Sequence, residues 1–163
     1  MNELFFIFSL FRWLYCSQAS QPNIVFILSD DLGWNDIGFH NASEIRSPNI
    51  DNLANTGLIL NNYYIQHICS PTRSALLSGL YPIHTGLQSG VINPTLPYGL
   101  TLDSKILPKQ FKDYTNYATH MIGKWHIGFF NWSYTPTYRG LAVFCIHSLY
   151  FVLCFVLNFS FYY

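Results

Sequence analysis

Three short stretches of this 163-residue chain carry side chains whose types and spacing could support catalysis. They are the adjacent carboxylates Asp30 and Asp31, the pair Cys69 and Arg73 four residues apart, and the pair Lys124 and His126 two residues apart. Two carboxylates suit a divalent cation, a cysteine suits nucleophilic attack, and the basic side chains suit an anionic group or proton transfer to a leaving oxygen. The combination predicts hydrolysis of an anionic ester.

Each stretch has a simpler interpretation when it is taken alone. Adjacent carboxylates repel unless a cation or hydrogen bonds offset their charge, but an Asp-Asp pair is more often a solvated turn. A free cysteine is usually a small buried hydrophobe, and a single lysine or histidine is usually a surface charge or a satisfied polar group. The other histidines, at positions 40, 67, 84, 120 and 147, have no tight metal-ligand spacing. The prediction therefore depends on the three stretches occurring together.

The carboxylate pair and the Lys-x-His stretch each follow a predicted strand. Residues 23–28 (NIVFIL) form a near-continuous apolar run, typical of an interior parallel strand, and the carboxylates come almost directly after it. Residues 117–122 (YATHMI) read as another strand before Lys124. Open α/β sheets bind ligands at the carboxyl ends of their strands. An extended segment would direct Lys124 and His126 to one side and Trp125 to the other.

The cysteine stretch, CSPTRSALLSG (69–79), reads as the start of a helix. Ser70 is a suitable N-cap, Pro71 suits the first helical position, and Gly79 suits the end. Cys69 would then lie at the positive end of the helix, where unpaired amides attract anions and favour a thiolate. Arg73 would lie over the same face and add a full charge.

Further elements complete a predicted α/β domain with a largely buried sheet. Ser47 and Pro48 can begin a helix that Gly57 ends, and residues 58–64 read as a returning strand. Another helix is expected around residues 105–113.

Apolar residues are concentrated at the two ends of the chain, which is 50% hydrophobic and only 10% charged. Residues 1–20 are expected to be a signal peptide, with Ser17 and Ala19 suited to cleavage; an N-terminal anchor or a buried segment is the alternative. Residues 141–163 lack Asp, Glu, Lys and Arg and are long enough to cross a bilayer of roughly 30 Å. This tail is either a transmembrane helix or a non-native end.

The charge balance and the cysteine content indicate which classes of binding partner and which cellular compartment are expected. Eight basic residues balance eight acidic ones, which argues against nucleic acid and against cationic partners. Cys69 is the one cysteine of the central region, so no disulfide framework is expected there. Glycosylation triplets at Asn41 and Asn131 fit a secretory route, whereas the one at Asn158 would be unusable inside a membrane.

Three motifs in about residues 22–140 resemble the N-terminal part of the sulfatase family, most closely arylsulfatase B and its relatives. They are NIVFILSDDLGWNDIGFH, NYYIQHICSPTRSALLSG with its Cys-x-Pro-x-Arg pattern, and THMIGKWHIG. The resemblance implies an alkaline-phosphatase-like α/β fold, with a mixed, mostly parallel sheet flanked by helices. Residues 21–140 would form a partial sulfatase domain, followed by the apolar tail.

The resemblance also implies a role for each site residue. Cys-x-Pro-x-Arg would direct the formylglycine-generating enzyme to Cys69, and the hydrated aldehyde would supply one hydroxyl to attack sulfur while the second later expels sulfate. Asp30, Asp31 and the modified Cys69 would bind Ca²⁺, which would polarise the sulfate. Arg73 would hold the formylglycine, Lys124 would bind the sulfate and His126 would steady the hydrated aldehyde.

Three functions remain open at this stage. The first is a sulfuric ester hydrolase of the secretory pathway, lysosomal or extracellular, acting on aryl sulfates or on sulfated carbohydrates such as N-acetylgalactosamine 4-sulfate. The second is an inactive fragment, tethered to a membrane if residues 141–163 span one, because family members continue after Gly140 with further calcium ligands and a further His and Lys. The third keeps the fold but uses Cys69 as a thiolate or acts on phosphate esters.

Overall fold

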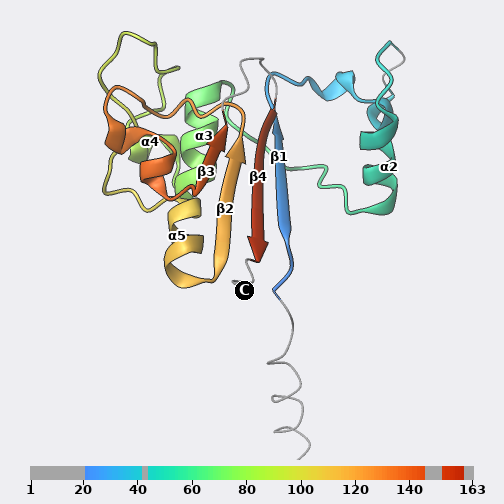
Figure 1. Cartoon of the computed structure of the whole chain (residues 1–163). Helices are drawn as coiled ribbons and strands as arrows, with labels where there is room; N and C mark the ends of the chain where they lie inside the picture. The colour runs from blue at the N-terminus through green and yellow to red at the C-terminus, as the bar shows by residue number, and fades with distance from the viewer. Residues whose placement is uncertain (1–20, 42–43, 146–151, 160–163) are drawn as a thin grey trace, which may run out of the picture.

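A four-stranded sheet in the order β1-β4-β2-β3 lies at the centre of the molecule (Figure 1). The computed structural model describes residues 21–41, 44–145 and 152–159. The strands are β1 (Ile24–Ser29), β2 (Tyr117–Ile122), β3 (Val143–Cys145) and β4 (Val152–Phe159). β4 is antiparallel to both β1 and β2, so these two strands run in the same direction. Their carboxyl ends therefore lie at the same edge of the sheet.

The register sets how far each strand reaches toward that edge. Cys154 of β4 pairs with Ile27 on one side and with Ile122 on the other. β1 continues two residues past this level, to Ser29, which pairs with Val152. β2 ends at the level of Cys154, and the chain leaves the sheet toward Lys124. Asp30 and Lys124 thus lie just beyond the carboxyl ends of β1 and β2, at the same edge of the sheet.

The α-helices are α2 (Pro48–Thr56), α3 (Cys69–Ser78), α4 (Pro82–Thr85) and α5 (Leu107–Tyr114). In the described parts of the chain, short 3₁₀ helices accompany them: η1 (Trp34–Asp36), η2 (Gly38–His40), η3 (Trp132–Tyr134) and η4 (Thr137–Arg139). α5 packs on β2 and contacts α3, which in turn contacts α4. In Figure 1, α3, α4 and α5 lie on the β2 side of the sheet, and α2 lies beyond β1.

The hydrophobic core lies on the side of α3 and β2. Its buried members come from α3, from the 87–106 segment, from β2 and from the residues that follow β2: Leu77, Leu87, Ile92, Leu100, Ile106, Met121, Trp125, Ile127 and Leu141. The loop that carries Lys124 and His126 is therefore part of the core, since Trp125 and Ile127 anchor it on both sides of His126.

Several predicted elements are confirmed. α2 begins after Ser47 and ends before Gly57, α5 carries Pro108 in its first turn, and β2 covers residues 117–122. The predicted strand over residues 58–64 is wrong, because these residues form a turn and irregular backbone. Leu58 and Tyr64 are 87% and 85% exposed, so this apolar run finds no sheet to pack on among the described residues.

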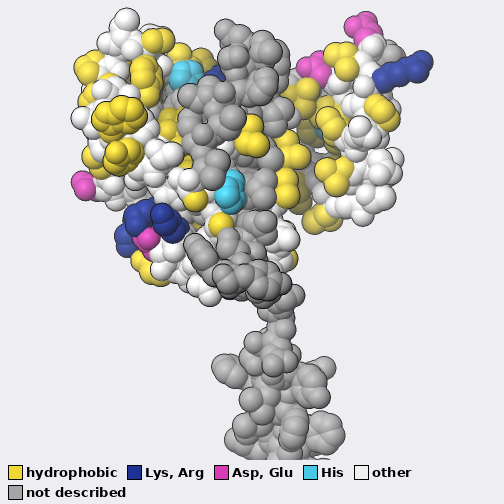
Figure 2. Space-filling model, viewed as in Figure 1, with side chains coloured by type: hydrophobic (Ala, Val, Ile, Leu, Met, Phe, Trp, Pro, Cys, Tyr) yellow, Lys and Arg dark blue, Asp and Glu magenta, His cyan; other side chains and the backbone are white. Residues whose placement is uncertain are grey.

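The sheet itself differs from the expected one in two respects. Its pairing is mixed, as predicted, but within the described residues only β2 and β3 pair in parallel. β1 was expected to be an interior strand, yet Val25 and Ile27 are 59% and 61% exposed. Exposed hydrophobic side chains also gather toward the α2 side of the molecule (Figure 2), where β1, α2 and residues 58–65 line an open groove.

The C-terminal apolar run also forms part of the sheet. Residues 143–145 and 152–159, which the sequence left as a transmembrane helix or a non-native end, are strands β3 and β4. Wherever the chain is described, no helix is long and apolar enough to cross a membrane. The predicted signal peptide (1–20) lies outside the described residues. β-branched and aromatic residues favour a strand where two neighbours offer unpaired backbone, as β1 and β2 do here.

Candidate active site

Cys69 is the first residue of α3, which begins two residues earlier in the chain than predicted. The N-cap is Ile68, with an extended backbone, and not Ser70. Pro71 still lies in the first turn, where a missing N–H costs nothing. The helix ends as predicted at Gly79, whose φ of 70° is left-handed. Cys69 is a free, half-buried cysteine and keeps the predicted place at the positive end of the helix.

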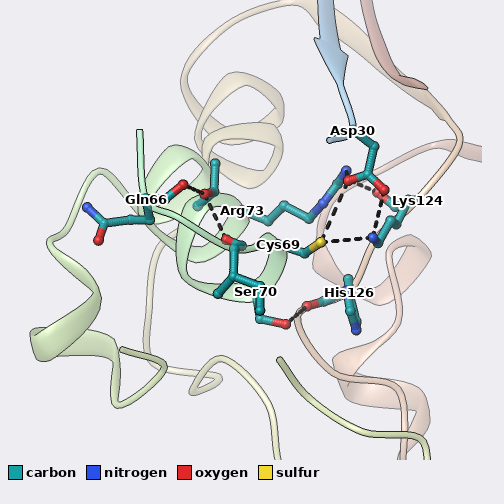
Figure 3. Close-up of polar contacts among 9 residues, drawn as sticks. Asp30, Gln66, Cys69, Ser70, Arg73, Lys124 and His126 are labelled. Atoms are coloured by element: carbon teal, nitrogen blue, oxygen red, sulfur yellow. Dashed lines mark hydrogen bonds and ion pairs between the residues drawn. The ribbon is translucent and has the colours of Figure 1, made fainter. Parts of the chain in front are cut away.

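Asp30 lies between two cationic side chains (Figure 3). Arg73 Nη2 donates to Asp30 Oδ1 at 2.9 Å, and Lys124 Nζ donates to Asp30 Oδ2 at 2.8 Å. Partial burial alone would raise the pKa of the Asp30 carboxyl. The hydrogen bonds and charges of Lys124 and Arg73 outweigh that effect and hold its pKa below the ordinary value of 3.8. Asp30 is therefore a carboxylate at neutral pH.

Lys124 connects the carboxylate to the cysteine. Its Nζ also donates to Cys69 Sγ at 3.0 Å, and the thiol lies 3.8 Å from Asp30 Oδ1. Burial alone would lower the pKa of Lys124, but the hydrogen bonds to Asp30 and Cys69 raise it above 10.5. A permanent positive charge thus lies in contact with the side chain of residue 69, where an anionic group could bind.

Arg73 is the most deeply buried charge of the cluster, with only 1% of the residue exposed. Besides its bond to Asp30, Nη1 donates to the Lys124 carbonyl at 2.6 Å. One guanidinium from α3 therefore fixes both the end of β1 and the loop after β2. Arginine suits this position because its planar fork offers donors in two directions at once.

His126 is oriented differently from the prediction. Lys124 and His126 do not lie on an extended segment, because His126 has a φ of 58°, in the left-handed region. Its Nε2 bonds to the Ile92 carbonyl at 3.1 Å, and its buried Nδ1 has no partner among the described residues. Burial, and then the charge of Lys124, lower the pKa of His126 below 6.5. The imidazole is therefore neutral near pH 7.

The side chain of Trp125 points away from that of His126, as predicted. Its indole N–H donates to the Gly128 and Tyr134 carbonyls.

Asp30, Asp31 and Cys69 could hold part of a metal site. One ligand atom from each lies within 4.8 Å of the others, and Asp31 is exposed with a φ of 53°. The two carboxylates suit Ca²⁺, which takes 6–8 oxygen ligands, whereas a thiol sulfur does not. The donor set therefore fits calcium as part of a shell and fits it better with an oxygen at position 69. A small pocket of about 170 Å³ opens at these residues.

The structure thus brings Asp30, Asp31, Cys69, Arg73 and Lys124 into one cluster, with His126 on the adjoining loop. The sequence reading missed the role of Ser70, which it took for a helix cap. Ser70 Oγ instead donates to the His126 carbonyl at 2.8 Å and accepts from the Ile92 amide at 3.1 Å. The one feature of the sequence that could have indicated this role is that Ser70 lies inside the motif that contains Cys69. Nothing in the sequence indicated Ile92.

Comparison with known proteins identifies the family of this chain. The family model described as Sulfatase matches residues 22–152. The chain is 50% identical to arylsulfatase J of Mus musculus over 126 residues, which cover 77% of this chain and 21% of that protein. It is 39% identical to arylsulfatase A of Homo sapiens over 111 residues, covering 68% of this chain and 22% of that protein.

A solved structure has the same fold. The crystal structure of Ps i-CgsB in complex with k-i-k-neocarrahexaose aligns with a TM-score of 0.66 and 34% identity, covering 72% of this chain and 27% of the other. The chain spans about a fifth of the length of the curated relatives it matches. The fold is accordingly alkaline-phosphatase-like, and this chain belongs to the sulfatase family.

Proposed function

We propose that this chain carries the nucleophile side of a sulfatase active site and hydrolyses sulfate esters once Cys69 is converted to formylglycine. One observation supports this most directly: Lys124 Nζ contacts both Cys69 Sγ and Asp30 Oδ2, at 3.0 and 2.8 Å. A cation, a nucleophile precursor and a carboxylate that can bind a metal are thus held within contact of one another. Cys69 also stands in the Cys-x-Pro-x-Arg pattern that the formylglycine-generating enzyme would recognise.

Each side chain has a defined task in this proposal. Formylglycine, when hydrated, supplies the hydroxyl that attacks sulfur. Lys124 binds a sulfate oxygen, and Arg73 fixes Asp30 and the loop that carries Lys124. The unpartnered Nδ1 of neutral His126 is free to accept a hydrogen bond from a hydroxyl at position 69.

The charges of the cluster indicate what a calcium ion would contribute. Asp30 and Asp31 carry two negative charges, and Arg73 and Lys124 carry two positive ones, so this cluster is neutral by itself. A bound Ca²⁺ would make it positive and attract a sulfate ester anion. Asp30, Asp31 and the oxygen at position 69 would hold the ion, and its charge would polarise the sulfate.

A sulfated carbohydrate, such as one carrying N-acetylgalactosamine 4-sulfate, is the proposed natural substrate, with simple aryl sulfates as substitutes. Two relatives support a sugar: an N-acetylgalactosamine-6-sulfatase of Homo sapiens, 35% identical, and Ps i-CgsB, crystallised with an oligosaccharide. A secretory location, lysosomal or extracellular, agrees with Asn41 and Asn131, because both glycosylation candidates are exposed.

A second function has its own support. The described residues offer only three clustered ligands, whereas calcium takes 6–8 oxygens. A sulfatase-like chain without catalytic activity, which retains the fold and the sulfate-binding charges, is therefore the competing proposal.

The experiment is hydrolysis of 4-methylumbelliferyl sulfate by the 163-residue chain, co-expressed with a formylglycine-generating enzyme. Mass spectrometry first measures how much Cys69 has been converted, and Cys69→Ala provides the blank. Turnover above that blank, resistant to a thiol-blocking reagent, supports the sulfatase. Turnover that the reagent abolishes supports a thiolate mechanism. No turnover from folded, aldehyde-bearing protein supports the inactive chain and overturns the sulfatase proposal.

A further inference from the structure

Ser70 joins three segments that meet beside Cys69. It is 0% exposed, and its hydroxyl donates to the His126 carbonyl at 2.8 Å and accepts from the Ile92 amide at 3.1 Å. A serine hydroxyl has a single hydrogen to donate, so that hydrogen is committed to His126. The contact with His126 is drawn in Figure 3, where Ser70 stands between Cys69 and the His126 loop.

These contacts close a ring. His126 Nε2 bonds to the Ile92 carbonyl at 3.1 Å, so Ile92 is linked to Ser70 through its amide and to the imidazole through its carbonyl. Ile92 is itself 1% exposed and belongs to the hydrophobic core. The backbone carbonyl of His126 is therefore held by Ser70 of α3, and its ring is held by Ile92 of the core, which is itself bonded to Ser70.

The ring acts on a residue whose backbone needs support. His126 has a φ of 58°, a conformation that L-residues other than glycine adopt rarely and keep only when their surroundings impose it. The neighbouring carbonyls are bound elsewhere: Lys124 O accepts from Arg73, and Ile127 O accepts from Leu100 N at 2.8 Å. Ser70 makes the hydrogen bond to the carbonyl of His126 itself.

We propose that Ser70 is a positioning residue, which holds His126 in its left-handed conformation and fixes the imidazole relative to residue 69. Because Ser70 and Cys69 are adjacent in the first turn of α3, the tie couples the histidine to the nucleophile position directly. The catalytic part of this inference rests on the proposed function, in which His126 Nδ1 binds a hydroxyl at position 69. The structural part does not depend on turnover.

The test compares Ser70→Ala, Ser70→Thr and Ser74→Ala in the full chain. Ser74 is the matched control, because it is also 0% exposed and in α3, but its hydroxyl bonds to the Pro71 carbonyl and to Thr85. NMR of the labelled chain follows the His126 Cα shift, which reports φ, and the exchange of the Ile92 amide. Ser70→Ala should move the shift and speed the exchange, whereas Ser70→Thr and Ser74→Ala should leave both near their original values.

Turnover of 4-methylumbelliferyl sulfate, normalised to aldehyde content, is the second measurement. Misplacing a catalytic group should lower kcat in Ser70→Ala by roughly 10- to 100-fold with little change in KM, and threonine should restore it. An unchanged His126 shift in Ser70→Ala overturns the positioning proposal whatever the activity, and so does an unchanged kcat in an active enzyme. If the unsubstituted chain is inactive but Ser70→Ala moves the His126 shift, the positioning tie stands and the proposed hydrolase fails.

Discussion

Arg73 Nη2 lies 2.9 Å from Asp30 Oδ1, and their side chains are only 2% and 11% exposed. This buried ion pair links α3 to the carboxyl end of β1. Removing Arg73 would leave Asp30 paired with Lys124 alone and would take the donor away from the Lys124 carbonyl, so the loss involves both a charge and a hydrogen-bonded loop. The pair therefore helps to hold Asp30 and Lys124 beside Cys69.

We expect Arg73→Ala to lower the free energy of unfolding by about 3–5 kcal/mol, because Asp30 and the Lys124 carbonyl both lose a donor. Arg73→Lys should recover only part of this loss, since one ammonium cannot reproduce the planar fork. Urea unfolding of the unmodified chain measures the effect. Lys109→Ala is the control, because its pair with Asp113 is exposed and should contribute about 0.3–0.5 kcal/mol. Equal losses from Arg73→Ala and Lys109→Ala would contradict the buried-pair argument.

His126 should make stability depend on pH in the mildly acidic range. Burial and the nearby Lys124 charge lower the pKa of the folded imidazole below its ordinary value of 6.5. Between the two pKa values the unfolded chain binds more protons than the folded chain. Stability should therefore be fully present above pH 6.5 and decrease as the pH falls toward the lower folded pKa. Protonation would also place a second N–H at the buried, unpartnered Nδ1.

The measurement is the free energy of unfolding in urea from pH 8 to pH 5, with EDTA present so that no metal competes. His126→Gln should flatten the profile in this range, and His84→Gln, at an exposed position of α4, should leave it unchanged. A profile of the same slope in His126→Gln would show that another group causes the loss.

Calcium binding should depend on the atom at position 69. An oxygen there adds a third hard ligand to Asp30 and Asp31, whereas a thiol does not. Cys69→Ser should therefore bind Ca²⁺ more tightly than the unmodified chain, and Asp31→Asn should weaken binding in either background. Isothermal titration with CaCl₂ gives the Kd. Asp113→Asn, far from the site in the exposed pair on α5, is the charge-matched control. Identical affinities in all five proteins would exclude this site for calcium.

The sequence indicated which residues lie close together better than it indicated the geometry that relates them. Asp30, Cys69 and Lys124 were expected to converge because each follows a strand or begins a helix, and chain direction alone brings such ends to one edge. The orientation of His126 could not be predicted in this way. Its left-handed backbone is imposed by Ser70 and by the packing of Trp125 and Ile127, which are long-range contacts that local spacing does not encode.

The fold shows the same division between local and long-range information. α2 and α5 were predicted because proline and glycine mark helix ends locally. Residues 58–64 were wrongly predicted to form a strand, and residues 143–145 and 152–159 were not predicted to form strands, because an apolar run becomes a strand only if other strands offer unpaired backbone. β4 finds two such neighbours, β1 and β2, whereas residues 58–64 find none among the described residues. Composition alone cannot distinguish these outcomes.

The exposed side chains of β1 give a last prediction. Val25 and Ile27 are 59% and 61% exposed on a strand that β4 covers on one edge. Exposed apolar strands promote association, and threonine keeps a strong strand preference while removing apolar surface. Val25→Thr combined with Ile27→Thr should lower both the binding of an apolar dye and the apparent mass in light scattering. The double variant should change the free energy of unfolding by no more than about 0.5 kcal/mol.

The control is Leu77→Thr in the core, which should destabilise the chain by about 2–5 kcal/mol. A comparable loss from the β1 double variant would mean that these side chains are packed in solution.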